Sequence, residues 1–358
     1  MTKQQPNPGG RYIVRECLGR GRWKEVYRAV VRGEFHDRAL ARFIEEPSAL
    51  MLLEEIKLLL PTPSAGKLEN IAQLYRAFKG ADGDIYLEEE LLYRPLETLA
   101  PLVIADQFFR IARDLCNGLA SLHHFDRIHR DLKLDNCGID HSRTAKIFDL
   151  GSVTSEGGQV KGSILSRAPE LFVVDAKCTK ASDVWALGAV LFALRTGGDY
   201  PFVHKEEARN RPLDGVERER FDELVLSRVT NPQAGATLIN RINQEFPNGS
   251  GELVRKMLDT NPTGRPTAAE ATEQWKQLLV PWTPAPASDQ GDTKDSEFQD
   301  IRAYLTAFLR GATDMSSLQW DRVSSASDKL DMQLNEPNRS ELREVRRQAA
   351  EMREAVVL

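Results

Sequence analysis

The run His129–Asn136 (HRDLKLDN) and the triplet Asp149–Gly151 (DLG) decide how this sequence is interpreted. Within six residues the run offers the carboxylate of Asp131, the amine of Lys133 and the amide of Asn136. A carboxylate can accept the proton of an attacking hydroxyl, and amide and carboxylate oxygens are ligands that Mg²⁺ accepts. An amine beside them can offset the charge of a phosphate. The two stretches therefore predict a site for magnesium-dependent phosphoryl transfer.

Length and composition limit the class of protein. The chain has 358 residues, which suits two domains, or one large domain with an extension. Hydrophobic residues make up 41% and charged residues 28%, so a wholly disordered chain is excluded. The net charge of −5 gives no indication of nucleic acid or an anionic membrane as the main partner.

The cysteines and the apolar runs bear on location. The four cysteines lie far apart, without the spacing of a metal site or of a disulfide framework, so we expect them to be reduced. The first ten residues lack the apolar run of a signal peptide. The longest apolar run, Val184–Leu194, has 11 residues and is too short to span a bilayer, as expected for a buried core helix. Together these features predict a cytoplasmic location.

The first quarter of the chain has the patterns of a small antiparallel sheet with one helix. Apolar and polar residues alternate in three stretches with glycines at the breaks, and an apolar stripe at helical spacing follows. Two more alternating stretches flank the turn Asp82-Gly83, which is a hairpin signal. The predicted meander of three strands spans 11–46 and the predicted helix spans 48–61. The two later strands are predicted at 71–78 and 85–92.

The rest of the chain is mainly helical. From residue 104 to about 280 the apolar residues follow a helical spacing. A proline-rich and then acidic run predicts a linker, and amphipathic patterns over 301–309 and from Ser340 onward predict two further helices. The expected organisation is a disordered start (1–10), a domain (11–280) with a small part (11–92) and a large part (93–280), a linker (281–300) and a helical extension (301–358).

A second cluster of candidate site residues lies near the start of the domain. Gly19 and Gly21 would let the backbone approach a phosphate without a Cβ in the way. Lys24 stands two residues before Val26, so on a strand the two side chains share a face. We therefore expect Lys24 to point toward the same ligand as Val26.

The run HRDLKLDN and the triplet DLG resemble the catalytic loop and the magnesium-binding motif of the eukaryotic-type protein kinases, H-R-D-L-x-x-x-N and D-F-G. The resemblance covers about residues 11–280 and implies an α+β fold of two lobes. A small antiparallel β lobe with one helix precedes a large, mainly α-helical lobe, and the C-terminal helical extension follows. Three later stretches resemble further motifs of the family: Ala168-Pro169-Glu170, Ser182–Gly188 and Arg265–Thr267.

These later motifs imply structural roles. By the resemblance, Glu170 is expected to pair with Arg265, and Asp183 to brace the backbone of the catalytic loop. Small-molecule kinases with similar catalytic loops usually lack this second set of motifs. The resemblance therefore favours protein substrates.

The resemblance also implies roles in the reaction. ATP and Mg²⁺ are the expected cofactors, and Lys133 with Gly162-Ser163 favours serine or threonine acceptors over tyrosine. Asp131 would orient and deprotonate the hydroxyl, while Asn136 and Asp149 hold magnesium. The residues expected around the nucleotide are Gly19, Gly21, Lys24, Val26, Ala39, Arg42, Glu90 and Leu92. The acidic run that contains Glu90 occupies the expected hinge, which leaves the nucleotide preference open.

The chain departs from the family at the strand that normally supplies a lysine to the ATP phosphates. Either Arg42 or Ala41 takes the lysine position, depending on the register. Lys24 stands where the family has its third glycine. This combination resembles the with-no-lysine kinases, in which the phosphate-binding lysine has moved to the neighbouring strand. Glu55, rather than Glu54, is the expected carboxylate that orders this cationic side.

Two functions are compatible with these motifs. Retention of Asp131, Asn136 and Asp149 favours an active serine/threonine kinase, whereas the missing strand lysine favours a pseudokinase that binds nucleotide or acts as a scaffold. The expected partners are a protein substrate and a surface, on the domain or on another protein, that the C-terminal helices dock to. Neither nucleic acid nor membrane is expected. Arg130, which precedes Asp131, predicts regulation by phosphorylation of the activation segment.

Overall fold

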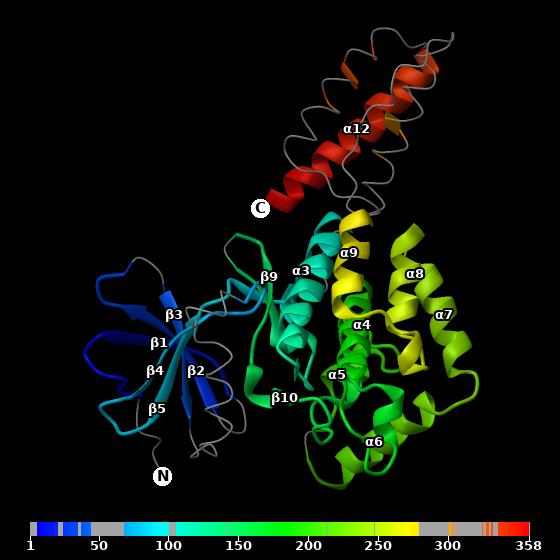
Figure 1. Ribbon diagram of the computed structural model, residues 1–358. Coiled ribbons are helices and arrows are strands. Elements are labelled where there is room, and N and C mark those ends of the chain that lie inside the picture. The colour runs from blue at the N-terminus through cyan, green and yellow to red at the C-terminus, as the bar shows by residue number, and fades with distance from the viewer. Residues whose placement is uncertain are drawn as a thin grey trace.

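The computed structural model describes most of the chain, in two lobes and a C-terminal helix (Figure 1). The described residues are 6–20, 24–34, 37–43, 68–99, 105–140, 142–212, 214–246, 248–278, 301–302, 305, 324, 327–328, 331 and 336–357. The predicted helix over 48–61 and the predicted linker over 281–300 lie outside these residues, as do Gly21, Glu54 and Glu55.

The small lobe is a five-stranded antiparallel sheet with the strand order β1-β2-β3-β5-β4. The strands are β1 (Tyr12–Arg20), β2 (Lys24–Val31), β3 (Asp37–Phe43), β4 (Leu74–Lys79) and β5 (Ile85–Glu90). The turn between β4 and β5 contains Gly83 with a φ of 89°, a conformation that favours glycine. The predicted meander and hairpin are confirmed, with strand ends that shift by up to three residues.

Alternation sorts the residues of this sheet onto two faces. Leu40 and Tyr86 belong to an apolar cluster on the outer face. Ala41 and Leu87 are fully buried on the inner face and join the main core, which continues into the large lobe. In β3 the odd-numbered residues therefore face the large lobe.

The start of the chain is more ordered than predicted. The backbone N–H of Asn7 donates to the Asp82 carboxylate at 2.7 Å, and the Asn7 carbonyl accepts from the Asp82 N–H at 3.3 Å. Pro8 is buried. The β4–β5 turn thus supplies hydrogen-bond partners to Asn7, within the segment for which the sequence predicts disorder.

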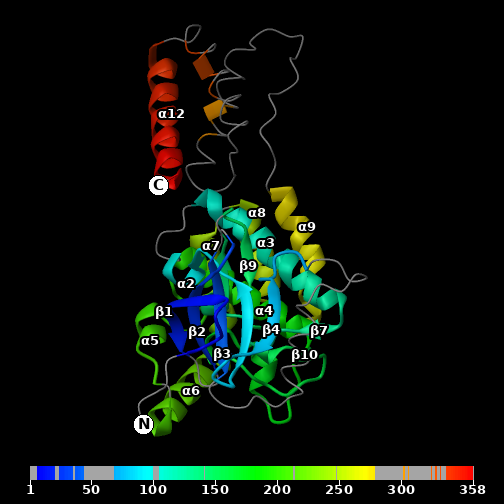
Figure 2. The ribbon, with the colours of Figure 1, turned by 90° about the vertical axis from the view of Figure 1, so that its left-hand side faces the viewer.

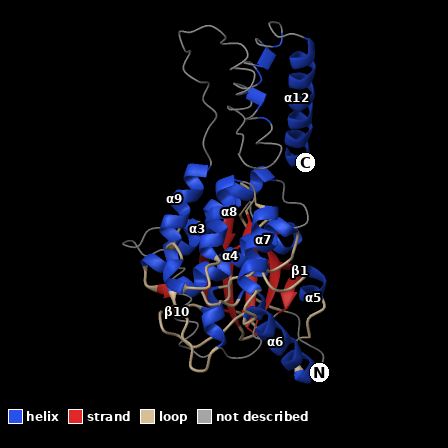
Figure 3. Ribbon diagram, turned by 90° about the vertical axis from the view of Figure 1, so that its right-hand side faces the viewer, coloured by secondary structure: helices blue, strands red, loops and turns tan. Residues whose placement is uncertain are grey.

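The large lobe is mainly helical, and Figure 3 shows its helices in front of the strands. Its helices are α2 (Leu96–Leu99), α3 (Ala105–His124), α4 (Lys180–Thr196), α5 (Lys205–Arg209), α6 (Gly215–Val229), α7 (Ala234–Glu245), α8 (Asn248–Met257) and α9 (Ala268–Leu278). Its short strands are β6 (Arg94–Pro95), β7 (Arg127–Ile128), β8 (Cys137–Ile139), β9 (Ala145–Ile147) and β10 (Thr154–Ser155). Single 3₁₀ turns span Leu134–Asn136, Leu150–Ser152, Ile164–Ser166, Pro169–Phe172 and Pro262–Gly264.

The apolar run over 184–194 forms the buried core helix that the sequence predicts. It lies in α4, which begins with a capping box between Thr179 and Ser182 and ends at Gly197 with a φ of 72°. Trp185 of α4 and Trp275 of α9 are among the largest fully buried side chains. This helix anchors the loops that carry the site.

The C-terminal helix α12 (Glu336–Val357) begins four residues before the predicted Ser340. Leu342 and Ala349 on α12 are fully buried, as are Ile301 and Leu305 before it. Figures 1 and 2 both show α12 beyond the ends of α3 and α9 and apart from the two lobes. No described helix combines the length and apolar character needed to cross a membrane.

Candidate active site

The catalytic loop is held from behind by a buried carboxylate. Asp183 of α4 is 1% exposed and accepts the backbone N–H groups of His129 at 2.6 Å and Arg130 at 2.9 Å. Arg130 has a φ of 67°, which turns the chain sharply ahead of Asp131. The expected bracing role of Asp183 is therefore confirmed, and it sets the position of the catalytic carboxylate.

Asp131 receives hydrogen bonds and charge from three directions. The Ser163 N–H donates to Oδ1 at 2.9 Å, and Asn136 Nδ2 donates to Oδ2 at 3.2 Å. Lys133 Nζ lies 3.5 Å from Oδ2. These contacts hold the carboxylate in one orientation, and 18% of its side chain remains exposed, as a general base that meets a substrate hydroxyl requires.

Asn136 is oriented by its own loop. Its Nδ2 also donates to the Asp131 backbone carbonyl at 2.8 Å, and only 4% of the residue is exposed. Because the nitrogen is used in these bonds, Oδ1 is the atom left for a metal ion. Asn136 and Asp149 thus supply two oxygen donors, which fits Mg²⁺ since it takes its other ligands from phosphate and water.

Asp149 is joined to the small lobe through Lys24. Lys24 Nζ of β2 lies 3.1 Å from Asp149 Oδ1, and the two side chains are 16% and 38% exposed. Burial alone would raise the pKa of Asp149, but attraction to Lys24 and its hydrogen bond outweigh burial and lower that pKa. The carboxylate is therefore ionised at neutral pH, as a metal ligand must be.

The register of the small sheet decides which residue takes the strand-lysine position. Val26 of β2 lies directly opposite Ala41 of β3, and both side chains pack on the main core. Ala39, which is buried, shares their face. Ala41 therefore takes the lysine position. Lys24 lies two residues before Val26 on β2 and on the same face of the sheet.

Arg42 points the other way, so its predicted place at the nucleotide is wrong. Its guanidinium binds the Asp84 carboxylate at 2.6 Å, and Nη1 lies 3.9 Å from Glu25. The physical reason is alternation: neighbours on a strand face opposite sides, so Ala41 on the inner face forces Arg42 outward.

Two glutamates of the acidic run at the end of β5 bind protein side chains. Glu88 is 2% exposed and accepts the Tyr12 hydroxyl at 2.7 Å. Glu90 pairs with Lys146 of β9 and accepts the Gln73 N–H at 3.1 Å. The Glu90 carboxylate is therefore engaged by Lys146 of the large lobe, and the place of Glu90 at the nucleotide stays a prediction.

Two further predicted residues are placed by their neighbours. Gly19 lies opposite Val26 in the sheet, and a side chain added there would meet open space. Leu92 packs against Gly138, where an added Cβ would lie 2.9 Å from Leu92 Cδ1. Both lie near the strands that carry Val26 and the metal-binding loop, and their contact with the nucleotide stays a prediction.

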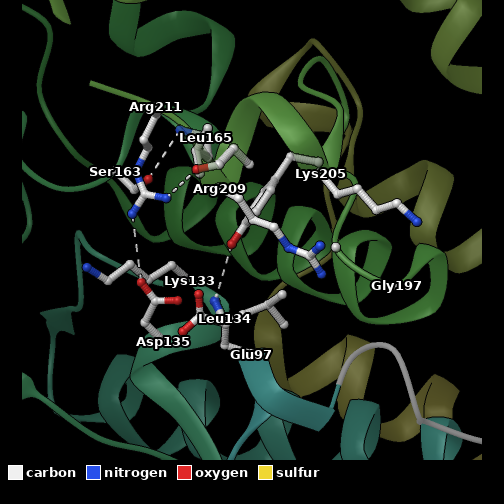
Figure 4. A pocket seen from close by; sticks show the side chains of 13 residues that line it. Glu97, Lys133, Leu134, Asp135, Ser163, Leu165, Gly197, Lys205, Arg209 and Arg211 are labelled. Atoms are coloured by element: carbon white, nitrogen blue, oxygen red, sulfur yellow. Dashed lines mark hydrogen bonds and ion pairs between the residues drawn. The ribbon is translucent and has the colours of Figure 1, made fainter. Parts of the chain in front are cut away.

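A pocket adjoins the catalytic loop; Lys133 and Ser163, which line it, were singled out from the sequence, whereas most of its other residues were not (Figure 4). It contains Glu97 and Asp135, and Figure 4 shows Arg211 reaching toward Asp135, 4.0 Å away. Burial, and then repulsion from Asp135, raise the pKa of Glu97. Of Glu97, Asp135 and Arg211, Asp135 belongs to the catalytic run and could have been noticed in the sequence, whereas the other two come from distant segments.

The comparisons with known proteins agree with this geometry. The family model "Protein kinase domain" matches residues 12–275. The chain is 26% identical to Mitogen-activated protein kinase pmk-1 of Caenorhabditis elegans, over 66% of this chain and 67% of that protein. It is 30% identical to Mitogen-activated protein kinase HOG1 of Wallemia sebi, over 57% and 79% respectively. It is also 30% identical to Serine/threonine-protein kinase 40 of Mus musculus, over 47% of this chain and 36% of that protein.

The match spans both lobes and contains the loop that positions Asp131 and the carboxylate that Lys24 reaches across from β2. Members of that family transfer phosphate from Mg-ATP, and this chain brings the carboxylates of Asp131 and Asp149 together with an amide and the Lys24 amine in one site. This chain belongs to the protein kinase family.

Proposed function

We propose that the chain phosphorylates serine and threonine hydroxyls of protein substrates with Mg-ATP. The observation that carries the proposal is the assembly of Asp131, Asn136, Asp149 and Lys24 into one site. The printed names of two relatives, a mitogen-activated protein kinase and a serine/threonine-protein kinase, support a protein substrate. Lys133, which lies beside Asp131, supports serine or threonine as the acceptor.

Each residue has a role that its contacts permit. Asp131 orients the substrate hydroxyl and takes its proton, while the nearby Lys133 offsets the charge of the phosphate in transfer. Asn136 and Asp149 hold the metal ion. Bound Mg-ATP supplies the phosphoryl group and neutralises much of its charge. The chain itself contributes position and preorganised charge.

We further propose that Lys24 is the phosphate-binding cation, as in the with-no-lysine kinases. Its side chain already extends from β2 to Asp149, next to the metal-binding oxygens. Ala41 cannot contact phosphate, and Arg42 is held by Asp84 on the opposite face. Lys24 is a compact point charge that can exchange between a carboxylate and a phosphate.

The test of the proposed function is transfer of the labelled γ-phosphate of ATP to a generic basic protein. We expect phosphoserine and phosphothreonine in the acid hydrolysate, and loss of transfer in Asp131→Asn. A pseudokinase would bind nucleotide with no transfer above that of Asp131→Asn, and this outcome would refute the proposal.

The location and the tail are proposed on separate grounds. The four cysteines are free, which supports the cytoplasm as the compartment. Cell fractionation that finds the chain in an oxidising compartment would contradict this.

We also propose that the helices from Ile301 onward dock on the kinase domain or on a partner protein, since isolated amphipathic helices are marginal in water.

A further inference from the structure

The pocket of Figure 4 lies beside the residue that would receive the substrate hydroxyl. Lys133 and Ser163 line this pocket, and both also contact Asp131. Lys133 Nζ lies 3.5 Å from the Asp131 carboxylate, and the Ser163 N–H donates to it at 2.9 Å. A protein substrate that presents its hydroxyl to Asp131 therefore brings a neighbouring residue to the pocket. The charges of the lining then act on that neighbour.

Cations outnumber carboxyl groups in this lining. The charged residues are Glu97 and Asp135 against Lys133, Lys205, Arg209 and Arg211. Burial, and then repulsion from Asp135, raise the pKa of Glu97, which lessens the negative charge that the two carboxyl groups carry together. The pocket is therefore positively charged although it holds two acidic residues.

Arg211 is the cation directed at these carboxyl groups. Its Nη1 donates to the Ala208 carbonyl at 2.6 Å, which fixes the side chain, and its Nη2 lies 4.0 Å from Asp135 Oδ2. Figure 4 shows this approach of the guanidinium to Asp135. A separation of 4.0 Å is longer than a hydrogen bond. Asp135 therefore attracts the guanidinium without forming the bidentate pair that would use its donors.

Two other cations of the pocket are less suited to bind a further charge. Lys133 lies beside Asp131, and Arg209 Nη1 lies 3.6 Å from Glu206. The Arg209 side chain is 58% exposed, whereas that of Arg211 is 31% exposed, so less water screens the charge of Arg211. A charged ligand in the pocket would therefore interact more strongly with Arg211 than with Arg209.

We propose that Arg211 makes this pocket a subsite for an acidic side chain of the protein substrate, close to the serine or threonine that is phosphorylated. A carboxylate can accept a charge-assisted hydrogen bond from the guanidinium, whereas Arg211 and Lys205 repel a lysine or arginine. Glu97 and Asp135 alone would attract such a cation, so Arg211 reverses the preference of the pocket. The inference rests on the proposed kinase function and adds a class of substrate to it.

The first experiment measures binding and needs no phosphoryl transfer. Short peptides with alanine in place of the acceptor carry glutamate, glutamine or lysine at each flanking position in turn. Calorimetry measures their affinities for the full chain in the presence of Mg-ADP. At one position we expect the glutamate peptide to bind about fivefold more tightly than the glutamine peptide, as for one partly exposed charge pair, and the lysine peptide to bind more weakly than both.

Exchange of Arg211 tests the assignment. Arg211→Gln should bind the glutamate and glutamine peptides equally, and Arg211→Glu should prefer the lysine peptide, because the pocket then has a third carboxyl group. Arg220→Gln is the matched control and should keep the preference of the parent, since Arg220 is exposed on α6 and does not line the pocket. Melting temperatures check folding, and a reversed preference cannot result from misfolding.

The proposal is wrong if the parent binds none of the peptides, binds all of them equally or prefers lysine. It is also wrong if Arg211→Glu keeps the preference of the parent.

The second experiment separates this inference from the proposed function. The same peptides with serine restored are compared by kcat/KM for transfer of the labelled phosphate. The glutamate peptide should again be favoured, and Arg211→Glu should again reverse the order. Transfer at equal kcat/KM to all peptides would support the kinase function and overturn the subsite. A preference in binding with no transfer to any peptide would support the subsite and overturn the kinase function.

Discussion

At the scale of single residues, the position of Lys24 is the feature that separates this chain from the usual kinase pattern. Lys24, Val26 and Ala41 share the inner face of the sheet, and Arg42 lies on the outer face with Asp84. We therefore propose Lys24 of β2 as the cation that contacts the α- and β-phosphates.

Lys24→Ala should reduce the transfer rate about 30- to 1,000-fold, because loss of a phosphate-binding cation costs about 2–4 kcal/mol in the transition state. Arg42→Ala should be milder, since that side chain faces Asp84. The rates kcat and kcat/KM for ATP measure both effects. Equal rates for Lys24→Ala and the parent would exclude Lys24 from the mechanism.

A rescue experiment separates position from charge. Adding Ala41→Lys to Lys24→Gly should recover part of the lost rate, because Ala41 lies on the inner face directly opposite Val26. Adding Arg42→Lys to Lys24→Gly is the matched control and should recover nothing, since residue 42 points outward. Rescue by residue 42 and not by residue 41 would show that the register drawn here is wrong.

At the scale of elements, a buried ion pair ties the end of the activation segment to the turn before α9. Arg265 binds Glu170 through two contacts of 2.7 and 2.8 Å, as the resemblance implied, and its side chain is fully buried. Arg265 also lies 5.0 Å from the centre of the Trp185 ring. The pair therefore connects α4, the activation segment and α9.

Glu170→Ala should destabilise the large lobe by about 3 kcal/mol, because it leaves the Arg265 charge buried without a counter-ion. Glu206→Ala, on the exposed side of α5, is the control and should change the unfolding free energy by less than about 0.5 kcal/mol. Urea unfolding followed by tryptophan fluorescence measures both. A Glu170→Ala loss no larger than the control would show that the pair contributes little to stability.

A second ion pair makes part of the stability depend on pH. The hydrogen bonds from Arg228 of α6 lower the pKa of Glu207 in α5 to about 2, from an ordinary value of 4.5. A lowered carboxyl pKa stabilises the fold above pH 4.5, and that contribution is lost as the pH falls from 4.5 toward 2. Because both side chains are 35% exposed, solvent screening limits it to about 0.5–1 kcal/mol.

The measurement is urea unfolding of the parent and Glu207→Gln at several pH values between 7 and 3. We expect Glu207→Gln to be less stable at pH 7 and the gap to close as the solution becomes more acidic. A gap that stays constant over this range would contradict the lowered pKa.

At the scale of the whole molecule, the chain combines a two-lobed kinase domain with a separate C-terminal helix. The Lys24–Asp149 pair joins the lobes at the site, and the Glu90–Lys146 pair joins β5 to β9. α12 has its own contacts with the segments before it, such as Arg343 with Asp331 at 2.7 Å and Arg302 with Glu341 at 2.5 Å.

Ending the chain at Val280 should leave the kinase domain folded, since the described core of that domain is complete at α9. If the tail docks as proposed, the shortened chain should differ from the full one in activity or in association state. Light scattering and the transfer assay detect this. No difference in either would rule out a docking role.

The family-like motifs, the strand and helix types, and the candidate residues Asp131, Asn136 and Asp149 can be predicted from the sequence, because these residues are close in the chain, where spacing alone specifies their arrangement. The choice between Ala41 and Arg42 and the pairing of Glu90 with Lys146 depend on the folded sheet. A one-residue difference in register exchanges the two faces of a strand, and ion pairs between distant segments leave no local pattern.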